Sequence, residues 1–261
     1  MTRVSEVFKD NKAFIPFITA GDPDIETTEK LVHSMTKAGA DLIELGIPFS
    51  DPVAEGPVIQ EASYRSLSAG TTIDKIFSMV ERIRKSNKVP LAFMTYINPI
   101  YNYGIERFMK VCSRLGVDAL IVADLPFEER NELKAVSDQY QITLISMISP
   151  TSQKRIPMIV KEAEGFIYCV SSMGVTGVRS EISCEIGSLI RSVKAVKDIP
   201  CAIGFGISSP TQAQKLATLS DGIIVGSAIV EIIAKHGGDS IPYVEAYVRE
   251  MKDGTRALTK K

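Results

Sequence analysis

The chain has 261 residues, of which 45% are hydrophobic and 23% charged, and its formal net charge at pH 7 is −1. This balance, without a basic tract, argues against a nucleic-acid or membrane-surface partner, and no apolar run approaches the roughly 20 residues that a membrane span needs. The first residues, MTRVSEVFKDNK, lack the apolar core of a signal peptide, so a cytoplasmic protein is expected. The four cysteines form no CxxC pair and have no nearby histidine, so no metal site is expected.

Short apolar runs alternate with longer segments of helical period. A small helix at Val4–Phe8 precedes the expected strands, which are Phe14–Thr19, Leu42–Leu45, Leu91–Thr95, Ala119–Val122, Thr143–Ile148, Phe166–Val170, Ala202–Phe205 and Ile223–Val225. The expected helices are Ile25–Lys37, Ile73–Lys85, Ile105–Leu115, Glu128–Tyr140, Lys154–Glu162, Ile186–Lys197, Pro210–Leu219, Ser227–Ala234 and Ile241–Met251. Nearly continuous apolar strands of this kind are buried on both faces of a parallel sheet.

The number of repeats indicates the fold class. Eight strand–helix repeats in about 250 residues are typical of an α/β protein with a closed (β/α)8 TIM barrel. We therefore predict one barrel domain over residues 1–261, with a short N-terminal helix and an extra short helix after strand 8. No linker or composition shift divides the chain.

Acidic residues stand out at the end of the second expected strand. Glu44 lies inside an apolar run, and Glu55 follows in a loop punctuated by Pro and Gly. Burying a carboxylate is costly unless a partner or a chemical task compensates, and the loops after the strands form the active face of such barrels. The pair therefore indicates acid/base chemistry. The alternative is that Glu44 is a structural acid in the barrel interior, paired with a Lys or Arg.

Glycine-rich loops follow the last three expected strands. The sequences MGVTG, GFGIS and VGSA lie at consecutive strand ends, where glycine lets the backbone N–H groups approach a ligand closely. Ser227 begins a helical stretch whose N-terminus favours an anion. Together these loops predict a phosphorylated small molecule as the substrate, because this region is the recurring phosphate site of the fold.

The residues at these strand ends closely resemble one family. The segment ELGIPFSDPVAEGPVIQ, with PFITAGDP, MTYINPIYNYG, VADLP and GVTG…GFGIS…DGIIVGSA, resembles the alpha subunit of tryptophan synthase from about Phe14 to about Ile232. The resemblance implies a (β/α)8 lyase that cleaves indole-3-glycerol phosphate to indole and glyceraldehyde 3-phosphate by a retro-aldol-type reaction. It also implies that this subunit needs no cofactor. The implied partner is a beta subunit that carries pyridoxal phosphate, in an alpha2beta2 heterotetramer.

The resemblance further implies roles for individual residues. Glu44 would be the general acid/base, Glu55 would engage the indole N–H, and Tyr168 would support Glu44. The other implied residues are Gly177, Phe205, Gly206, Gly226 and Ser227 for the phosphate, Phe17 and Tyr96 for the indole pocket, Thr176 for a mobile lid loop at 171–183, and Asp51, Pro52, Asn98, Asn102 and Asp124, as loop residues, for the partner interface.

Two departures from the family pattern keep a second hypothesis open. Glu55 stands where the familiar pattern has Asp, and Ser172-Met173 stands where many relatives carry an Arg. The chain could therefore have weakened lyase activity and act mainly as an allosteric activator of the beta subunit. A third hypothesis, another phosphate-binding barrel such as indole-glycerol-phosphate synthase or a sugar-phosphate isomerase, does not call for this pair of acids. Asp22-Pro23 is expected to be a simple turn.

Overall fold

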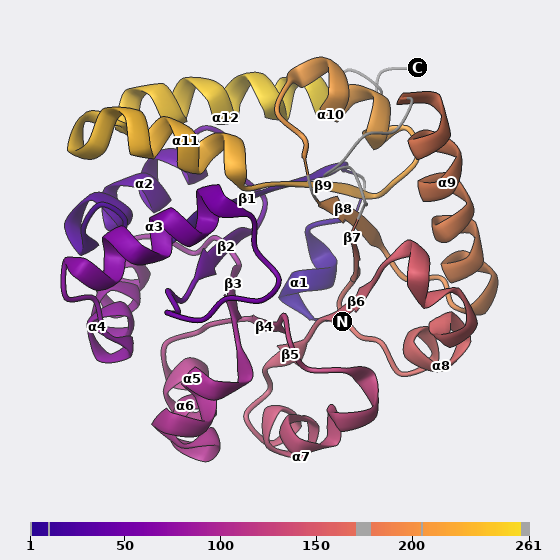
Figure 1. The fold of residues 1–261 in the computed structure, drawn as a ribbon, viewed down its shortest axis with the longest axis horizontal. Coiled ribbons are helices and arrows are strands. Elements are labelled where there is room, and N and C mark those ends of the chain that lie inside the picture. The colour runs from indigo at the N-terminus through magenta and orange to yellow at the C-terminus, as the bar shows by residue number, and fades with distance from the viewer. Residues whose placement is uncertain (1, 10, 171–178, 205, 257–261) are drawn as a thin grey trace.

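The computed structural model describes residues 2–9, 11–170, 179–204 and 206–256. Within these ranges, parallel strands form one sheet in the order β5-β4-β3-β2-β1-β9-β8-β7-β6, and helices surround it (Figure 1). The strands are β1 (Ala13–Thr19), β2 (Ile43–Gly46), β3 (Leu91–Thr95), β4 (Ala119–Val122), β5 (Thr143–Leu144), β6 (Ser146–Ile148), β7 (Ile167–Val170), β8 (Cys201–Gly204) and β9 (Gly222–Val225). The α-helices are α1 (Arg3–Glu6), α2 (Ile25–Lys37), α3 (Pro57–Ser68), α4 (Ile73–Arg84), α5 (Ile97–Tyr103), α6 (Ile105–Arg114), α7 (Asn131–Gln139), α8 (Ile156–Lys161), α9 (Arg179–Val196), α10 (Pro210–Ala217), α11 (Ser227–His236) and α12 (Ile241–Arg256). No helix among the described residues is both long and apolar enough to cross a membrane.

The two ends of this sheet meet, which makes it a barrel. β5 and β6 occupy opposite ends of the strand order, yet only Ile145 separates them in the chain. β5 pairs with β4, β6 pairs with β7, and the Ile145 N–H donates to the Leu120 carbonyl at 2.9 Å. The expected strand Thr143–Ile148 is thus two short strands that close the ring. The prediction of a (β/α)8 barrel with a short N-terminal helix and a further helix after the last strand is confirmed.

Strand side chains alternate between the barrel interior and the surrounding helices. All seven residues of β1 are buried, as expected for a strand covered on both faces. The interior cluster includes Val4, Ala13, Ile15, Leu42, Ala92, Ala119, Ile121, Ile145, Phe166, Tyr168, Ala202 and Ile224. Because such interiors are close-packed, truncating Leu42 to Ala is expected to cost about 2–5 kcal/mol of stability.

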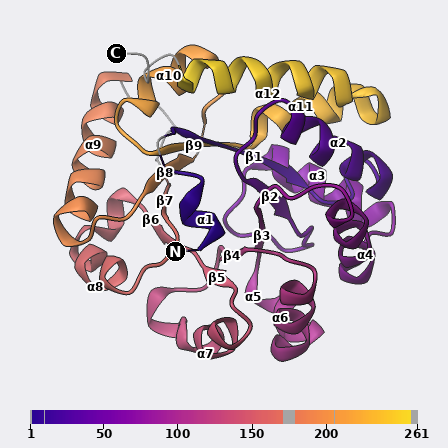
Figure 2. The same cartoon turned by 180° about the vertical axis from the view of Figure 1, so that it is seen from behind.

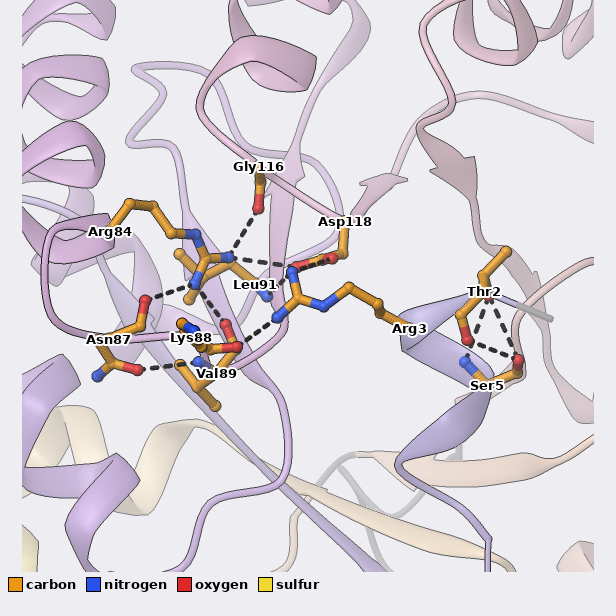
Figure 3. Close-up of polar contacts among 10 residues, drawn as sticks. All are labelled: Thr2, Arg3, Ser5, Arg84, Asn87, Lys88, Val89, Leu91, Gly116 and Asp118. Atoms are coloured by element: carbon orange, nitrogen blue, oxygen red, sulfur yellow. Dashed lines mark hydrogen bonds and ion pairs between the residues drawn. The ribbon is translucent and has the colours of Figure 1, made fainter.

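Helix α1 fills the amino-terminal end of the barrel. Seen from either side, α1 projects inside the ring of helices, and its Val4 belongs to the interior cluster (Figure 2). Arg3 on this helix donates to Asp118 Oδ1 at 2.8 Å, and Arg84 at the end of α4 reaches Asp118 Oδ2 at 3.2 Å (Figure 3). These contacts tie the helix to the loops that enter β3 and β4. The carboxyl-terminal end of the barrel is therefore the one available to a ligand.

Two helices lie where the sequence favoured loops. Helix α3 starts at Pro57, and α5 contains Pro99 in its first turn. Proline is tolerated at both positions because the first N–H groups of a helix have no partner within it. Asn98 and Asn102 consequently lie on α5, so the expectation that they are loop residues was wrong.

Helix α9 also begins earlier than expected, at Arg179 instead of Ile186. The intervening residues contain neither Gly nor Pro, so nothing in them terminates a helix. The last part of the expected lid loop, 179–183, is thus helical, which corrects its boundary. Residues 171–178 lie outside the described part of the chain.

Candidate active site

A cavity of about 360 Å³ lies at the carboxyl-terminal end of the barrel. Its walls come from the ends of β1, β3, β7 and β9, the loops after β2 and β8, and the start of α11. The lining residues are Phe17, Ala54, Glu55, Gly56, Ile59, Met94, Tyr168, Gly206, Ile207, Ser208, Ile224, Gly226, Ser227, Ala228 and Glu231. Among the described residues, no group of three or more His, Cys, Asp or Glu side chains could hold a metal ion.

Glu44 lies on β2 and is fully buried. Its neighbours across the sheet are Phe17 on β1 and Ala92 on β3. Neither carboxylate oxygen has a hydrogen-bond partner among the residues that the structure describes. Burial raises the pKa of Glu44 to about 8, so the side chain holds a proton at neutral pH. The alternative of a structural acid paired with Lys or Arg is therefore wrong within the described chain.

Tyr168 on β7 lies in the interior cluster and lines the cavity. Burial raises its pKa well above the ordinary value, and the negative charge of an ionised Glu44 raises it further. The hydroxyl therefore stays protonated and close enough to Glu44 to interact with it. A Cβ at Gly204 would lie 2.5 Å from the Tyr168 hydroxyl oxygen, so glycine at this position makes room for the ring.

Phe17 on β1 lines the cavity in the same way. A Cβ at Gly46 would lie 2.5 Å from the Phe17 ring, and a Cβ at Gly226 would lie 3.2 Å from it. The strand-end glycines thus leave space inside the barrel for an aromatic wall. Met94, from β3, is a further lining residue that the sequence had not singled out, because an apolar residue on a strand carries no distinguishing signal.

Glu55 is half-buried in the loop between β2 and α3 and lines the cavity. Burial raises the pKa of Glu55, and a hydrogen bond from the Tyr96 hydroxyl partly offsets this rise. The same hydroxyl oxygen accepts the Ala54 N–H at 3.1 Å. Tyr96 is 1% exposed, and burial raises its pKa to about 12, so it is a neutral donor. Tyr96 is not among the residues that line the cavity; it lies behind the Glu55 loop and holds it.

The loop after β8 and the start of α11 form the other end of the cavity. Gly206 has a φ of +68°, a conformation that favours glycine, and the next loop residues are held by two hydrogen bonds. The Ser208 N–H donates to the Gln212 side chain at 2.9 Å, and the Tyr247 hydroxyl donates to the Ser208 carbonyl at 3.1 Å. Ser227 is the first residue of α11, so its N–H group is free of helical hydrogen bonds. The expected site residues Thr176, Gly177 and Phe205 lie outside the described residues.

Arg65 on α3 anchors the helix that follows the Glu55 loop. It forms two hydrogen bonds of 2.8 Å with the carboxylate of Asp22, which is 1% exposed in the loop after β1. Such a bidentate pair fixes geometry as well as charge. The expectation that Asp22-Pro23 is only a turn was therefore incomplete, since Asp22 also holds α3 in position. Local sequence patterns could not reveal this contact, because Asp22 and Arg65 are far apart in the chain.

Comparison with known proteins assigns this arrangement to a family. Residues 5–256 match the family model for the tryptophan synthase alpha chain. The chain belongs to the tryptophan synthase alpha chain family. Alpha chains of Lacticaseibacillus casei and Alkaliphilus metalliredigens are 46% and 50% identical, over 97% and 86% of this chain and 95% and 84% of theirs.

Solved structures agree with this assignment. The alpha subunit of tryptophan synthase from Legionella pneumophila superposes with a TM-score of 0.90 at 34% identity, covering 99% of this chain and 100% of that one. A chain of the tryptophan synthase a2b2 complex from Pyrococcus furiosus superposes with a TM-score of 0.86 at 35% identity, covering 92% of this chain and 98% of that one. The family assignment thus extends over nearly the whole barrel.

The residues expected to meet a partner subunit all lie at the carboxyl-terminal end of the barrel. Asp51 is exposed and Pro52 half-buried in the Glu55 loop, and Asn98 and Asn102 lie on α5. Asp124, after β4, accepts the Ile97 N–H at 2.8 Å and so holds the start of α5. The structure therefore places these residues in the segments that follow β2, β3 and β4, at one end of the barrel.

A second cavity, of about 440 Å³, opens at the same end of the barrel between β4 and β6. Its lining includes Asp124, Arg130, Met147 and Arg155 but neither Glu44 nor Glu55. Glu55 lines the smaller cavity, and Glu44 lies opposite Phe17, another residue of that cavity, on the neighbouring strand. That cavity is the candidate active site.

Proposed function

We propose that this chain cleaves indole-3-glycerol phosphate to indole and glyceraldehyde 3-phosphate in tryptophan biosynthesis. Membership in the tryptophan synthase alpha chain family supports this activity. The observation that carries the site assignment is the fully buried Glu44, whose carboxylate has no hydrogen-bond partner among the described residues. It lies opposite Phe17 of a cavity that contains a second carboxylate, Glu55. A buried acid with a raised pKa is typical of a proton donor.

Glu44 acts first as an acid and then as a base. Its carboxyl group donates a proton to C3 of the indole ring, which makes the ring a better leaving group. The resulting carboxylate then accepts the proton of the glycerol hydroxyl as the C3–C1′ bond breaks and the aldehyde forms. The bond electrons return to the ring and restore indole, so the reaction is balanced and Glu44 ends protonated as it began. A pKa of about 8 suits both roles near neutral pH.

Glu55 engages the indole N–H while the ring carries positive charge. A carboxylate at this position stabilises the protonated ring more than the neutral one, which is the condition for catalysis. Tyr168 supports Glu44 with its neutral hydroxyl, and Phe17 forms one wall of the indole pocket. Gly206, Gly226 and Ser227, together with Gly177 and Phe205 from outside the described residues, bind the phosphate through backbone N–H groups.

The proposed partner is a tryptophan synthase beta subunit in an alpha2beta2 assembly. The a2b2 complex from Pyrococcus furiosus, which contains a similar chain, supports this. The docking face would be the carboxyl-terminal end of the barrel, with Asp51, Pro52, Asn98, Asn102 and Asp124. Proton transfer by Glu44, with Glu55 stabilising the protonated ring, requires no cofactor in this subunit, and pyridoxal phosphate is expected in the partner. The cytoplasmic location stays a prediction.

The alternative of an activator subunit with weakened lyase activity is not favoured, since both acids are retained at the cavity and the relatives are named as alpha chains. The decisive experiment measures indole release from indole-3-glycerol phosphate by the purified chain, alone and with beta subunit. We expect release in both conditions and more in the second. Absence of indole in both, while the beta reaction is still stimulated, would establish the activator instead.

A further inference from the structure

Glu231 is an acidic residue at the end of the cavity that the proposed mechanism does not use. It lies on α11, four residues after Ser227, and both residues line the cavity. Residues four apart share one face of a helix, so the carboxylate stands one turn above the free N–H groups that would bind the phosphate. A negative side chain beside an anion site weakens anion binding and calls for an explanation.

No cation in the described lining of the cavity offsets this charge. The lining contains the carboxyl groups of Glu55 and Glu231 and the neutral hydroxyl of Tyr168, but no Lys, Arg or His among the residues that the structure describes. The charge of Glu231 also reaches Tyr247 on α12, whose pKa is raised to about 12 by burial and then by Glu231. The Tyr247 hydroxyl in turn donates a hydrogen bond to the Ser208 carbonyl, in the loop after β8. Glu231 is therefore an exposed negative charge beside Ser227, with no cation among the described residues that line the cavity.

On the basis of the proposed lyase function, we propose that Glu231 is a specificity residue that favours a phosphate group carrying a proton over an anion that carries none. A carboxylate repels every anion, but it accepts a hydrogen bond from a P–OH group. A phosphate monoester holds its second proton up to about pH 6, so a bound phosphate can keep that proton when it faces Glu231. Sulfate has the same shape and no proton at neutral pH, and so it meets only repulsion. The site thereby rejects sulfate by an unfavourable contact.

Equilibrium binding of inorganic phosphate and of sulfate, measured by titration calorimetry at pH 7, tests this proposal without any turnover. We expect wild-type protein to bind sulfate more weakly than phosphate, on the order of tenfold. In Glu231→Gln the amide can donate to either anion, so the two dissociation constants should become nearly equal, with sulfate gaining more. Glu231→Asp, which keeps the charge, should retain a preference for phosphate.

Glu132→Gln is the matched control, because Glu132 is an exposed glutamate on α7, away from the cavity, and its substitution changes the net charge equally. Its phosphate-to-sulfate ratio should equal that of the wild type. An unchanged ratio in Glu231→Gln, or no binding of either anion to the wild type, would overturn the proposal. Indole release measured on the same preparations tests the lyase function separately, since it does not depend on discrimination between the two anions.

Discussion

At the amino-terminal end of the barrel, the carboxylate of Asp118 accepts hydrogen bonds from Arg3, Arg84 and the Leu91 N–H, whereas near the carboxyl-terminal end both oxygens of Glu44 lack a partner among the described residues (Figure 3). Burial raises the pKa of both acids. At Asp118 the Leu91 N–H and the two arginines offset this effect, while at Glu44 no group in the described part of the chain does. The first carboxylate holds α1 and two strand entrances together. The second keeps a raised pKa, which is typical of a proton donor, and its proposed acid/base role would account for its costly burial.

The largest effect is expected for Glu44→Gln, which removes the buried acid. Removal of the acid should lower kcat for indole release by on the order of 1,000-fold, since general acid/base catalysis typically contributes 100- to 10,000-fold. Steady-state assays of indole formation measure the loss. Retention of more than a tenth of the wild-type kcat would exclude Glu44 as the acid/base.

The same substitution should stabilise the protein at neutral pH. The pKa of Glu44 is about 8 when folded against an ordinary 4.5, so the folded state keeps a proton that the unfolded state releases. Wild-type stability is therefore highest below pH 4.5 with respect to this group and falls as pH rises towards 8. Glu44→Gln removes that loss, which amounts to about 3 kcal/mol at pH 7. Urea unfolding at several pH values measures it, and an equal pH slope in both proteins would contradict the assigned pKa.

Asp118→Asn should have the opposite effects to Glu44→Gln, lowering stability while leaving kcat nearly unchanged. It leaves the partly buried Arg84 without its counter-charge, so the free energy of unfolding should fall by about 3 kcal/mol. The kcat of the folded enzyme should be nearly unchanged, because this network lies at the closed end of the barrel. Urea unfolding and indole assays on the same samples separate the two effects. A large fall in kcat with normal stability would show that the two ends of the barrel are coupled.

The sequence predicted the strands and the main helices because each repeat carries its own local pattern of apolar residues. It also located Glu44 and Glu55, since acids in an apolar strand and a Pro-rich loop stand out locally. It could not predict that Tyr96 supports Glu55 without itself lining the cavity, or that Asp22 pairs with Arg65. Those contacts depend on how distant segments meet. Glu231 was overlooked because an exposed acid on an amphipathic helix carries no local signal that it lines a cavity.

Tyr96→Phe tests the single hydrogen bond between the Tyr96 hydroxyl and Glu55. Loss of the hydroxyl should lower kcat about tenfold, because Glu55 is no longer held in place. It should also raise the pKa of Glu55, since the Tyr96 hydrogen bond lowers it, so the acidic limb of the pH–rate profile should move to higher pH. Tyr103→Phe on α5, whose hydroxyl bonds to Asp74 at 2.6 Å, is the matched control and should leave the profile unchanged. A fall in kcat without any shift of the acidic limb would mean that Tyr96 acts only through packing.

The smallest effect is expected for Glu55→Asp, which restores the residue typical of the family pattern. Shortening the side chain withdraws the carboxylate from the Tyr96 hydroxyl but keeps its charge, and the surrounding loop contains exposed residues such as Val53 and can adjust. We expect kcat to stay within about threefold of the wild type, since misplacement on the order of 1 Å is costly only where the loop cannot follow. Kinetics of Glu55→Asp in the Tyr96→Phe background complete a double-mutant cycle. If the hydroxyl positions Glu55, the two effects will not add; a gain of tenfold or more in the single variant would instead identify Glu55 as an impairment.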